Sequence, residues 1–148
     1  MKIVVTGTSG RIGRAIHFNL CRDHQVVGID RNPSSATSHL GNIDDLAFLT
    51  RAFEGADAVI HTAALHAPHV DLESENDFER INIEGTRNVV RAALENGIHR
   101  LVYTSTTALF GYASWHPEQA VWVDEETEPQ PRSIYHRTKL ATEHYLES

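Results

Sequence analysis

The chain has 148 residues, a length that suits one domain with a real hydrophobic core. The net charge of −7 and the lack of a Lys/Arg cluster argue against nucleic acid or an anionic membrane surface as partner. The single cysteine, Cys21, excludes a disulfide framework within the chain. No apolar run is long enough to span a bilayer, and the first residues lack signal-peptide features, so we expect a cytoplasmic protein without a membrane partner.

In chain order, short β-branched runs alternate with segments of helical periodicity, which is typical of a parallel sheet with crossover helices. Strands are predicted over residues 2–6, 25–30, 37–40, 56–62 and 100–104, of which the third is weak. Helices are predicted over residues 14–22, 44–53, 73–96 and from 135 onward, and a long loop over residues 111–133. The pattern predicts an α/β fold with a doubly wound parallel sheet and helices on both faces.

Some apolar side chains in these segments carry a further prediction. Ile12, Ile16 and Leu20 share one face of the first predicted helix, so we expect that face to be buried. Trp115 and Trp122 lie in the long loop, where we expect them to anchor the loop to the core; the alternative is a lid or a hydrophobic patch.

A glycine motif, Thr6-Gly7-Thr8-Ser9-Gly10-Arg11-Ile12-Gly13, joins the first strand to the first helix. Between a strand and a helix this pattern indicates dinucleotide binding of the Rossmann type. Gly7 suits the tight turn, Gly10 leaves room for a pyrophosphate, and Gly13 lets the helix pack closely. The N–H groups at the helix start would face the phosphates. The alternative is a glycine-rich turn without a ligand.

Asp30 ends the second strand, 17 residues after Gly13. A carboxylate there can accept both ribose hydroxyls of an adenosine, and it repels a 2′-phosphate, which favours NAD over NADP. Arg31 is the complication, because its guanidinium could instead receive the phosphate of NADP. A solvated turn residue is the remaining interpretation of Asp30.

Tyr135 and Lys139 stand four residues apart on the last predicted helix and therefore share a face. A nearby ammonium stabilises a phenolate, which makes tyrosine usable as a general acid or base. Such pairs also arise by chance on helix surfaces, although this chain has only two lysines, Lys2 and Lys139. The hydroxyl-rich run Tyr103–Thr107 leaves the end of the fifth strand, at the sheet edge where ligands of open α/β proteins bind, so its hydroxyls can bond a substrate oxygen beside Tyr135. The alternative is that these threonines reflect strand propensity and turn chemistry alone.

Three histidines, His61, His66 and His69, raise the question of a metal site. Their positions on a strand end and a Pro-containing loop do not suit a ligand set, so no metal is predicted.

Taken together, these motifs make the chain resemble the extended short-chain dehydrogenases/reductases, the NAD-dependent epimerase/dehydratase group. The resemblance covers the whole chain. It also includes GNID at 41–44, HTAA at 61–64, INIEGTRNVVRAA at 81–93 and YTSTTALFG at 103–111. It implies one NAD(P)-binding Rossmann domain over residues 1–148.

The resemblance also implies roles for individual residues. Those expected at the cofactor are Gly7, Gly10, Arg11, Ile12, Asp30, Arg31, Asn42, Ile43, Ala63, Ala64, Asn82, Tyr135 and Lys139. Asn42 departs from the aspartate usual in the family. The catalytic residues implied are Thr106, Tyr135 and Lys139, with Ser105 as second choice for contact with the substrate.

The function implied is an NAD-dependent epimerase, dehydratase or dehydrogenase acting on a sugar or nucleotide sugar. The alternatives are a dinucleotide-binding module or redox sensor without turnover, and an inactive fragment. Members of the group normally continue with a substrate-binding lobe, so these residues are expected to be either a fragment of a longer enzyme or a shortened relative. The end of the chain inside a predicted helix favours the fragment. The resemblance further implies a homodimer through the helices at 73–96 and 135–148.

Overall fold

The computed structural model describes residues 1–148, the side chain of Ser114 excepted, and the chain forms two compact units. Unit 1 comprises Met1–Ala64 and Glu84–Thr104, and unit 2 comprises Leu65–Ile83 and Ser105–Ser148. Among the described residues, no helix is long and apolar enough to cross a bilayer.

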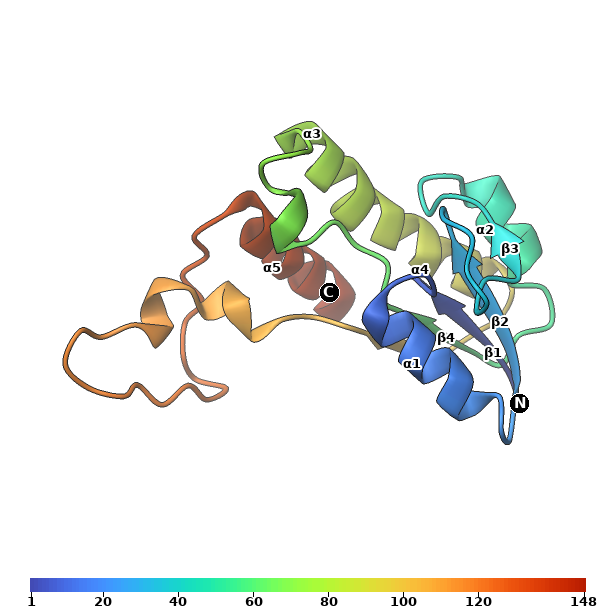
Figure 1. Cartoon of the computed structure of the whole chain (residues 1–148), viewed down its shortest axis with the longest axis horizontal. Helices are drawn as coiled ribbons and strands as arrows, with labels where there is room; N and C mark the ends of the chain where they lie inside the picture. The colour runs from blue at the N-terminus through green and yellow to red at the C-terminus, as the bar shows by residue number, and fades with distance from the viewer. The chain divides into compact units, whose positions relative to one another are not determined.

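Unit 1 is built around a sheet of five parallel strands (Figure 1). The strands are β1 (Lys2–Thr6), β2 (Gln25–Asp30), β3 (His39–Leu40), β4 (Ala58–His61) and β5 (Leu101–Tyr103), and their order is β3-β2-β1-β4-β5. Val4 of the central strand pairs in register with Val27 on one side and Val59 on the other. These valines are buried because helices cover both faces of the sheet.

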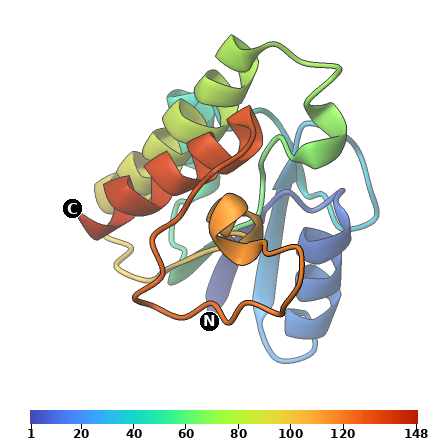
Figure 2. The same ribbon diagram turned by 90° about the vertical axis from the view of Figure 1, so that its left-hand side faces the viewer.

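Helix α1 (Arg11–Leu20) covers one face of this sheet, and α2 (Leu46–Ala52) and α4 (Gly85–Glu95) pack together on the other (Figures 1 and 2). The α2 helix begins at Asp45, whose side chain accepts a hydrogen bond of 2.9 Å from the N–H of Phe48. The doubly wound Rossmann-type sheet predicted from the sequence is thereby confirmed.

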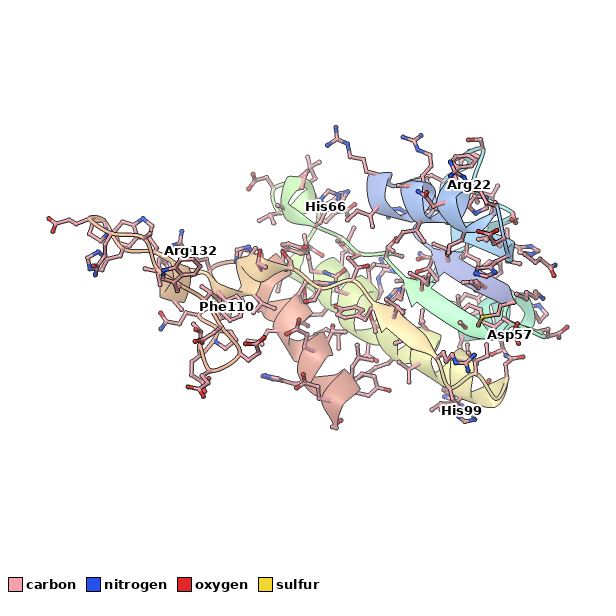
Figure 3. The ribbon with its side chains drawn as sticks, turned by 90° about the horizontal axis from the view of Figure 1, so that it is seen from below. Arg22, Asp57, His66, His99, Phe110 and Arg132 are labelled. Carbon is pink, nitrogen blue, oxygen red and sulfur yellow. The ribbon has the colours of Figure 1, made fainter. Side chains whose placement is uncertain are left out.

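Unit 2 is helical. It contains η1 (Ala67–His69), α3 (Glu75–Phe78), η3 (Thr107–Phe110), η4 (Tyr112–Ser114) and α5 (Ile134–Glu147), and α3 continues into a π-helical segment, η2 (Glu79–Glu84). Helix α5 lies beside α3 and contacts η3 (Figure 2). Arg132 lies in the loop before α5 (labelled in Figure 3). Its guanidinium is 4.4 Å from the ring centre of Tyr112.

Three expectations about the burial of side chains were wrong. Ile12 is 55% exposed, and Gly13 and His17 are the buried residues of α1. Trp115 and Trp122 are 62% and 93% exposed, so neither anchors the loop to a core. The long helix expected over residues 73–96 is present as α3, η2 and α4, with the π-helical segment in its middle.

Candidate functional site

The turn after β1 is held tightly to the end of β4. Gly7 has a φ of +81°, a conformation that L side chains rarely adopt, and its N–H donates to the carbonyl of Ile29 at 2.8 Å. A Cβ atom at Gly7 would lie 2.7 Å from both the Ala63 nitrogen and the Thr62 Oγ1. The glycine turn and Ala63, two parts of the expected cofactor site, are therefore neighbours.

Gly10, at the start of α1, has more open surroundings than Gly7. Its φ of −75° suits any residue, and a Cβ atom there would meet only the Gly7 carbonyl oxygen, at 3.2 Å. No side chain caps the helix, so its first N–H groups have no such acceptor. Space in front of unpaired N–H groups is what a diphosphate requires, so this turn fits a dinucleotide. Arg11 and Ile12 follow in the first turn with exposed side chains.

Asp30 closes β2 and is bonded to the same turn. Its Oδ2 accepts from the N–H of Ser9 at 2.9 Å, and its Oδ1 accepts from the N–H of Asn32, also at 2.9 Å. Each carboxylate oxygen keeps further acceptor capacity, so ribose hydroxyls could still donate to Asp30. Arg31, beside it, is exposed.

The next expected cofactor residues follow β3 and β4. Ile43 is buried against Gly85 of α4, where a Cβ atom would come within 2.7 Å of the Ile43 Cδ1. Asn42 and Ala64 are half-buried, and the Ala63 N–H donates to the Thr6 Oγ1 at 3.3 Å.

The histidines considered for a metal site have other partners. The buried ring of His61 bridges β1 and α4, with Nδ1 at 2.6 Å from the Thr6 hydroxyl and Nε2 at 3.0 Å from the Thr86 hydroxyl. In unit 2, the N–H of His66 donates to the Nδ1 of His69 at 3.0 Å. Burial, and then the charge of His69, lower the pKa of His66.

Helix α5 carries the second group of expected site residues. Ser133 caps it, with its hydroxyl accepting from the N–H of His136 at 3.4 Å, so the helix begins just before Tyr135. Tyr135 is half-buried, whereas Lys139, one turn later, is only 3% exposed. Burial lowers the pKa of Lys139 to about 8, and the negative charge of Glu143 acts in the opposite direction.

The hydroxyl run after β5 lines a hollow beside α5. The hollow has a volume of about 340 Å³ and is lined by Ser105, Thr106, Thr107, Leu109, Phe110 and Glu143 (Phe110 is labelled in Figure 3). Thr106 Oγ1 accepts from the N–H of Ala108 at 3.2 Å, which caps η3. The Oγ of Ser105 is buried and has no hydrogen-bond partner among the described atoms.

Asn82 occupies the π-helical segment and ties two parts of unit 2 together. Its side chain accepts from the Leu65 N–H at 2.8 Å and donates to the Leu65 carbonyl at 3.0 Å. It also donates to the Thr138 hydroxyl at 3.0 Å, next to Lys139 on α5. Asn82 thus positions α5 and the start of the loop after β4.

Two residues around these groups were not predicted from the sequence. Glu143 lies four residues after Lys139, so the helical spacing that paired Tyr135 with Lys139 could also have found Glu143. The hydroxyl of Thr86 is hydrogen-bonded to the Nε2 of His61. This pairing is long-range, so no local pattern in the sequence predicts it.

Known proteins resemble this chain in sequence and in fold. The sequence model of the "NAD dependent epimerase/dehydratase family" matches residues 3–148. The L-arabinose 1-dehydrogenase (NAD(P)(+)) of Haloferax volcanii is 35% identical over 94% of this chain and 57% of its own length. The N-acetyl-alpha-D-glucosaminyl-diphospho-ditrans,octacis-undecaprenol 4-epimerase of Escherichia coli O157:H7 is 26% identical over 97% of this chain and 42% of its own length.

Among solved structures, a short-chain dehydrogenase/reductase superfamily protein from Agrobacterium tumefaciens with bound NAD has 32% identity and a TM-score of 0.82. The alignment covers 99% of this chain and 44% of that one. The Thermus thermophilus UDP-glucose 4-epimerase complex with NAD has 28% identity and a TM-score of 0.84, covering 99% and 50%. The chain thus spans about half the length of these relatives. It belongs to the NAD-dependent epimerase/dehydratase family.

Proposed function

We propose that this chain supplies the dinucleotide-binding and acid–base residues of an oxidoreductase that acts on a hydroxyl group of a sugar or nucleotide sugar. The observation that carries the proposal is the pairing of Tyr135 with Lys139, whose ammonium group is buried. The chain belongs to the NAD-dependent epimerase/dehydratase family and also has the glycine turn. The names of the relatives, an L-arabinose dehydrogenase and a UDP-glucose 4-epimerase, support the substrate class.

The glycine turn would hold the diphosphate, with the backbone of Gly7, Gly10, Arg11 and Ile12 around it. The open space at Gly10 and the uncapped start of α1 support this role. Asp30 would bind the adenosine ribose, and its charge favours NAD over NADP. The bound nicotinamide would accept the hydride that leaves the substrate carbon.

The remaining cofactor contacts are proposed from the resemblance. Asn42 and Ile43 would border the adenine, and Ala64 would follow Ala63 along the cofactor. For Ala63 the proposal has support, because Ala63 borders the glycine turn. Asn82 would act indirectly, because its side chain holds the Leu65 backbone and the Thr138 hydroxyl in place.

Tyr135 would take the proton of the substrate hydroxyl as hydride leaves the carbon. The ammonium of Lys139 would stabilise the phenolate form, because a positive charge nearby favours the ionised form of an acid. Thr106 would hold the substrate oxygen, since its hydroxyl can donate while it accepts from Ala108. Ser105 is the second candidate, and its buried hydroxyl without a partner supports it.

The test is Tyr135→Phe, assayed by NADH formation with aldoses and UDP-sugars. We expect turnover to fall by about 100-fold or more, the usual contribution of a general acid or base, while NAD affinity stays close to wild type. Tyr145→Phe, on the same helix, is the matched control and should retain turnover. Turnover of Tyr135→Phe near the wild-type level would remove Tyr135 from this role.

A second candidate function is NAD binding without turnover. It is supported by the position of the glycine turn, Asp30 and Ala63, which all lie in unit 1 with its own sheet and core. Calorimetric NAD binding combined with no hydride transfer to any sugar tested would favour this candidate over the enzyme.

We also propose a homodimer formed through the helical segments 73–96 and 135–148. Leu94 supports the proposal, because it is a large apolar side chain of α4 that is 62% exposed.

A further inference from the structure

The hollow in unit 2 combines hydroxyl groups with one carboxylate. Three of its six lining residues, Ser105, Thr106 and Thr107, contribute hydroxyls, and Glu143 contributes the carboxylate from α5. Glu143 is half-buried, so its charge is screened less than that of a fully exposed group. The proposed chemistry gives Glu143 no role.

Glu143 continues a row that begins at the proposed catalytic pair. Tyr135, Lys139 and Glu143 follow one another at intervals of four residues within the unbroken helix α5. Side chains four apart on a helix are neighbours on one face, so Lys139 has Tyr135 on one side and Glu143 on the other. The exposed Glu147 follows one further turn along.

We propose that Glu143 is a positioning residue that keeps the buried ammonium group of Lys139 charged and in place next to Tyr135. The proposal rests on the proposed function, in which the charge of Lys139 stabilises the phenolate. A buried ammonium loses hydration, and a carboxylate one turn away restores part of the stabilisation of the charged form. The opposing effects of burial and of Glu143 on the pKa of Lys139 agree with this arrangement.

The other acidic side chains on the elements packed against α5 are exposed or paired with an arginine. The segment η2, which is bonded to α5 through Asn82 and Thr138, carries Glu79 and Glu84; both are exposed, and Glu84 pairs with Arg87. The segment η3 (Thr107–Phe110) has no titratable side chain. Helix α3 carries Glu75 and Asp77, but Glu75 pairs with Arg137 at 2.9 Å and Asp77 pairs with Arg80 at 2.9 Å.

The titratable groups of α5 other than Lys139 and Glu143 do not replace Glu143 either. They are Tyr135, His136, Arg137, His144, Tyr145 and Glu147, of which Glu147 alone is a second carboxylate. Glu147 is two turns from Lys139 and exposed, so we expect water to screen its charge.

The experiment uses the presence of only two lysines in the chain. With ¹³Cε-labelled lysine, the NMR spectrum contains one signal from Lys2 and one from Lys139, and Lys2→Arg assigns them. The titration midpoint of each signal reports the pKa of that lysine directly. Lys2, which lies in unit 1, serves as the internal reference.

In Glu143→Gln we expect the Lys139 midpoint to fall by about half a unit or more, a shift of at least about threefold in the protonation equilibrium. Glu147→Gln, the matched control, should leave it unchanged, as should every variant for Lys2. Glu143→Asp keeps the charge on a shorter side chain, so we expect a smaller fall. This variant replaces Glu143→Gln if the latter does not fold.

An unchanged Lys139 midpoint in Glu143→Gln, or in Glu143→Asp if that variant alone folds, would overturn the proposal and leave the proposed function standing. The turnover of Glu143→Gln separates the two claims further. If the Lys139 midpoint falls and the alkaline limb of the pH–rate profile moves to lower pH with it, the role of Glu143 and the proposed function are both supported. If the midpoint falls and the profile does not change, Glu143 has the proposed effect on Lys139, but the acid–base role of Lys139 is contradicted.

Discussion

Gly7 and Gly97 both have a positive φ, of +81° and +69°, but their surroundings differ. A Cβ atom at Gly97 meets no atom within 4 Å, whereas at Gly7 it lies 2.7 Å from backbone and side-chain atoms of the β4 end. We expect Gly97→Ala to lower the free energy of unfolding by about 1–2 kcal/mol, from backbone strain alone. Gly7→Ala should lower it by at least about 1 kcal/mol more, because the overlap adds to the strain. Urea unfolding of the two variants measures the difference, and equal losses would show that the close approach of Gly7 carries no cost.

Lys139 makes stability depend on pH. Its pKa is about 8 in the folded chain and near 10.5 when unfolded, so below about pH 8 both states are charged and burial of the ammonium has a constant cost. The contribution of Lys139 to the free energy of unfolding rises as the pH increases from about 8 to 10.5, because the unfolded chain binds more protons in this range. Lys139→Met removes the cost, so we expect it to be more stable at neutral pH, by up to about 3 kcal/mol.

Urea unfolding of the wild type and Lys139→Met at several pH values measures this effect. The advantage of the variant should shrink as the pH rises from about 8 toward 10.5. A variant that is less stable at neutral pH, by an amount independent of pH, would contradict the account.

At the residue scale, the sequence predicted what local spacing determines. The four-residue interval placed Tyr135 and Lys139 on one helix, and the motif placed Gly7 in a tight turn. It did not predict that Lys139 is buried or that Ser105 has an unpartnered hydroxyl, because both depend on long-range packing.

At the element scale, the π-helical segment Glu79–Glu84 places Asn82 where it can bond the Leu65 backbone twice and Thr138 once. Asn82→Asp is nearly isosteric, but it replaces the donor Nδ2 with an acceptor and introduces a buried charge. We expect the free energy of unfolding to fall by about 2–4 kcal/mol, since the Leu65 carbonyl and the Thr138 hydroxyl lose a donor. Thermal unfolding checks this, with Asn76→Asp, at an exposed position of α3, as the control. Equal melting temperatures for the two variants would rule out this function of Asn82.

The β-branched runs identified the five strands, because buried parallel strands need continuous apolar side chains. The spacing of apolar residues did not predict the buried face of α1 or the π-helical segment. Gly13 and His17 replace Ile12 on the buried face of α1, because the helix packs closely on the turn through Gly13. The π-helical segment adds a residue to one helical turn, a local change that the averaged spacing of apolar residues over 73–96 conceals.

At the scale of the whole molecule, the proposed homodimer predicts a role for the exposed Leu94 of α4. Leu94→Glu should convert a dimer to a monomer in light scattering at micromolar concentration, because it places a charge in an apolar interface. Leu40→Glu is the matched control, since Leu40 is 60% exposed and lies on β3, outside the helical segments of the proposed interface. A wild-type protein that is monomeric under these conditions would contradict the dimer.

The proposed function requires that the turn after β1 binds the diphosphate of NAD, and Gly10→Asp is the variant that probes this binding. Aspartate suits the start of a helix and Gly10 has an ordinary φ, so the variant should melt no lower than wild type. Its carboxylate would occupy the space in front of the N–H groups of α1 and repel the diphosphate.

Isothermal titration calorimetry with NAD is the deciding measurement. We expect wild type and Asn19→Asp, which adds the same charge on the exposed face of α1, to bind NAD alike. Gly10→Asp should bind at least about 100-fold more weakly, as expected for two like charges within a few ångströms. A wild-type chain that binds no NAD, or a folded Gly10→Asp variant that binds it with unchanged affinity, would contradict the account.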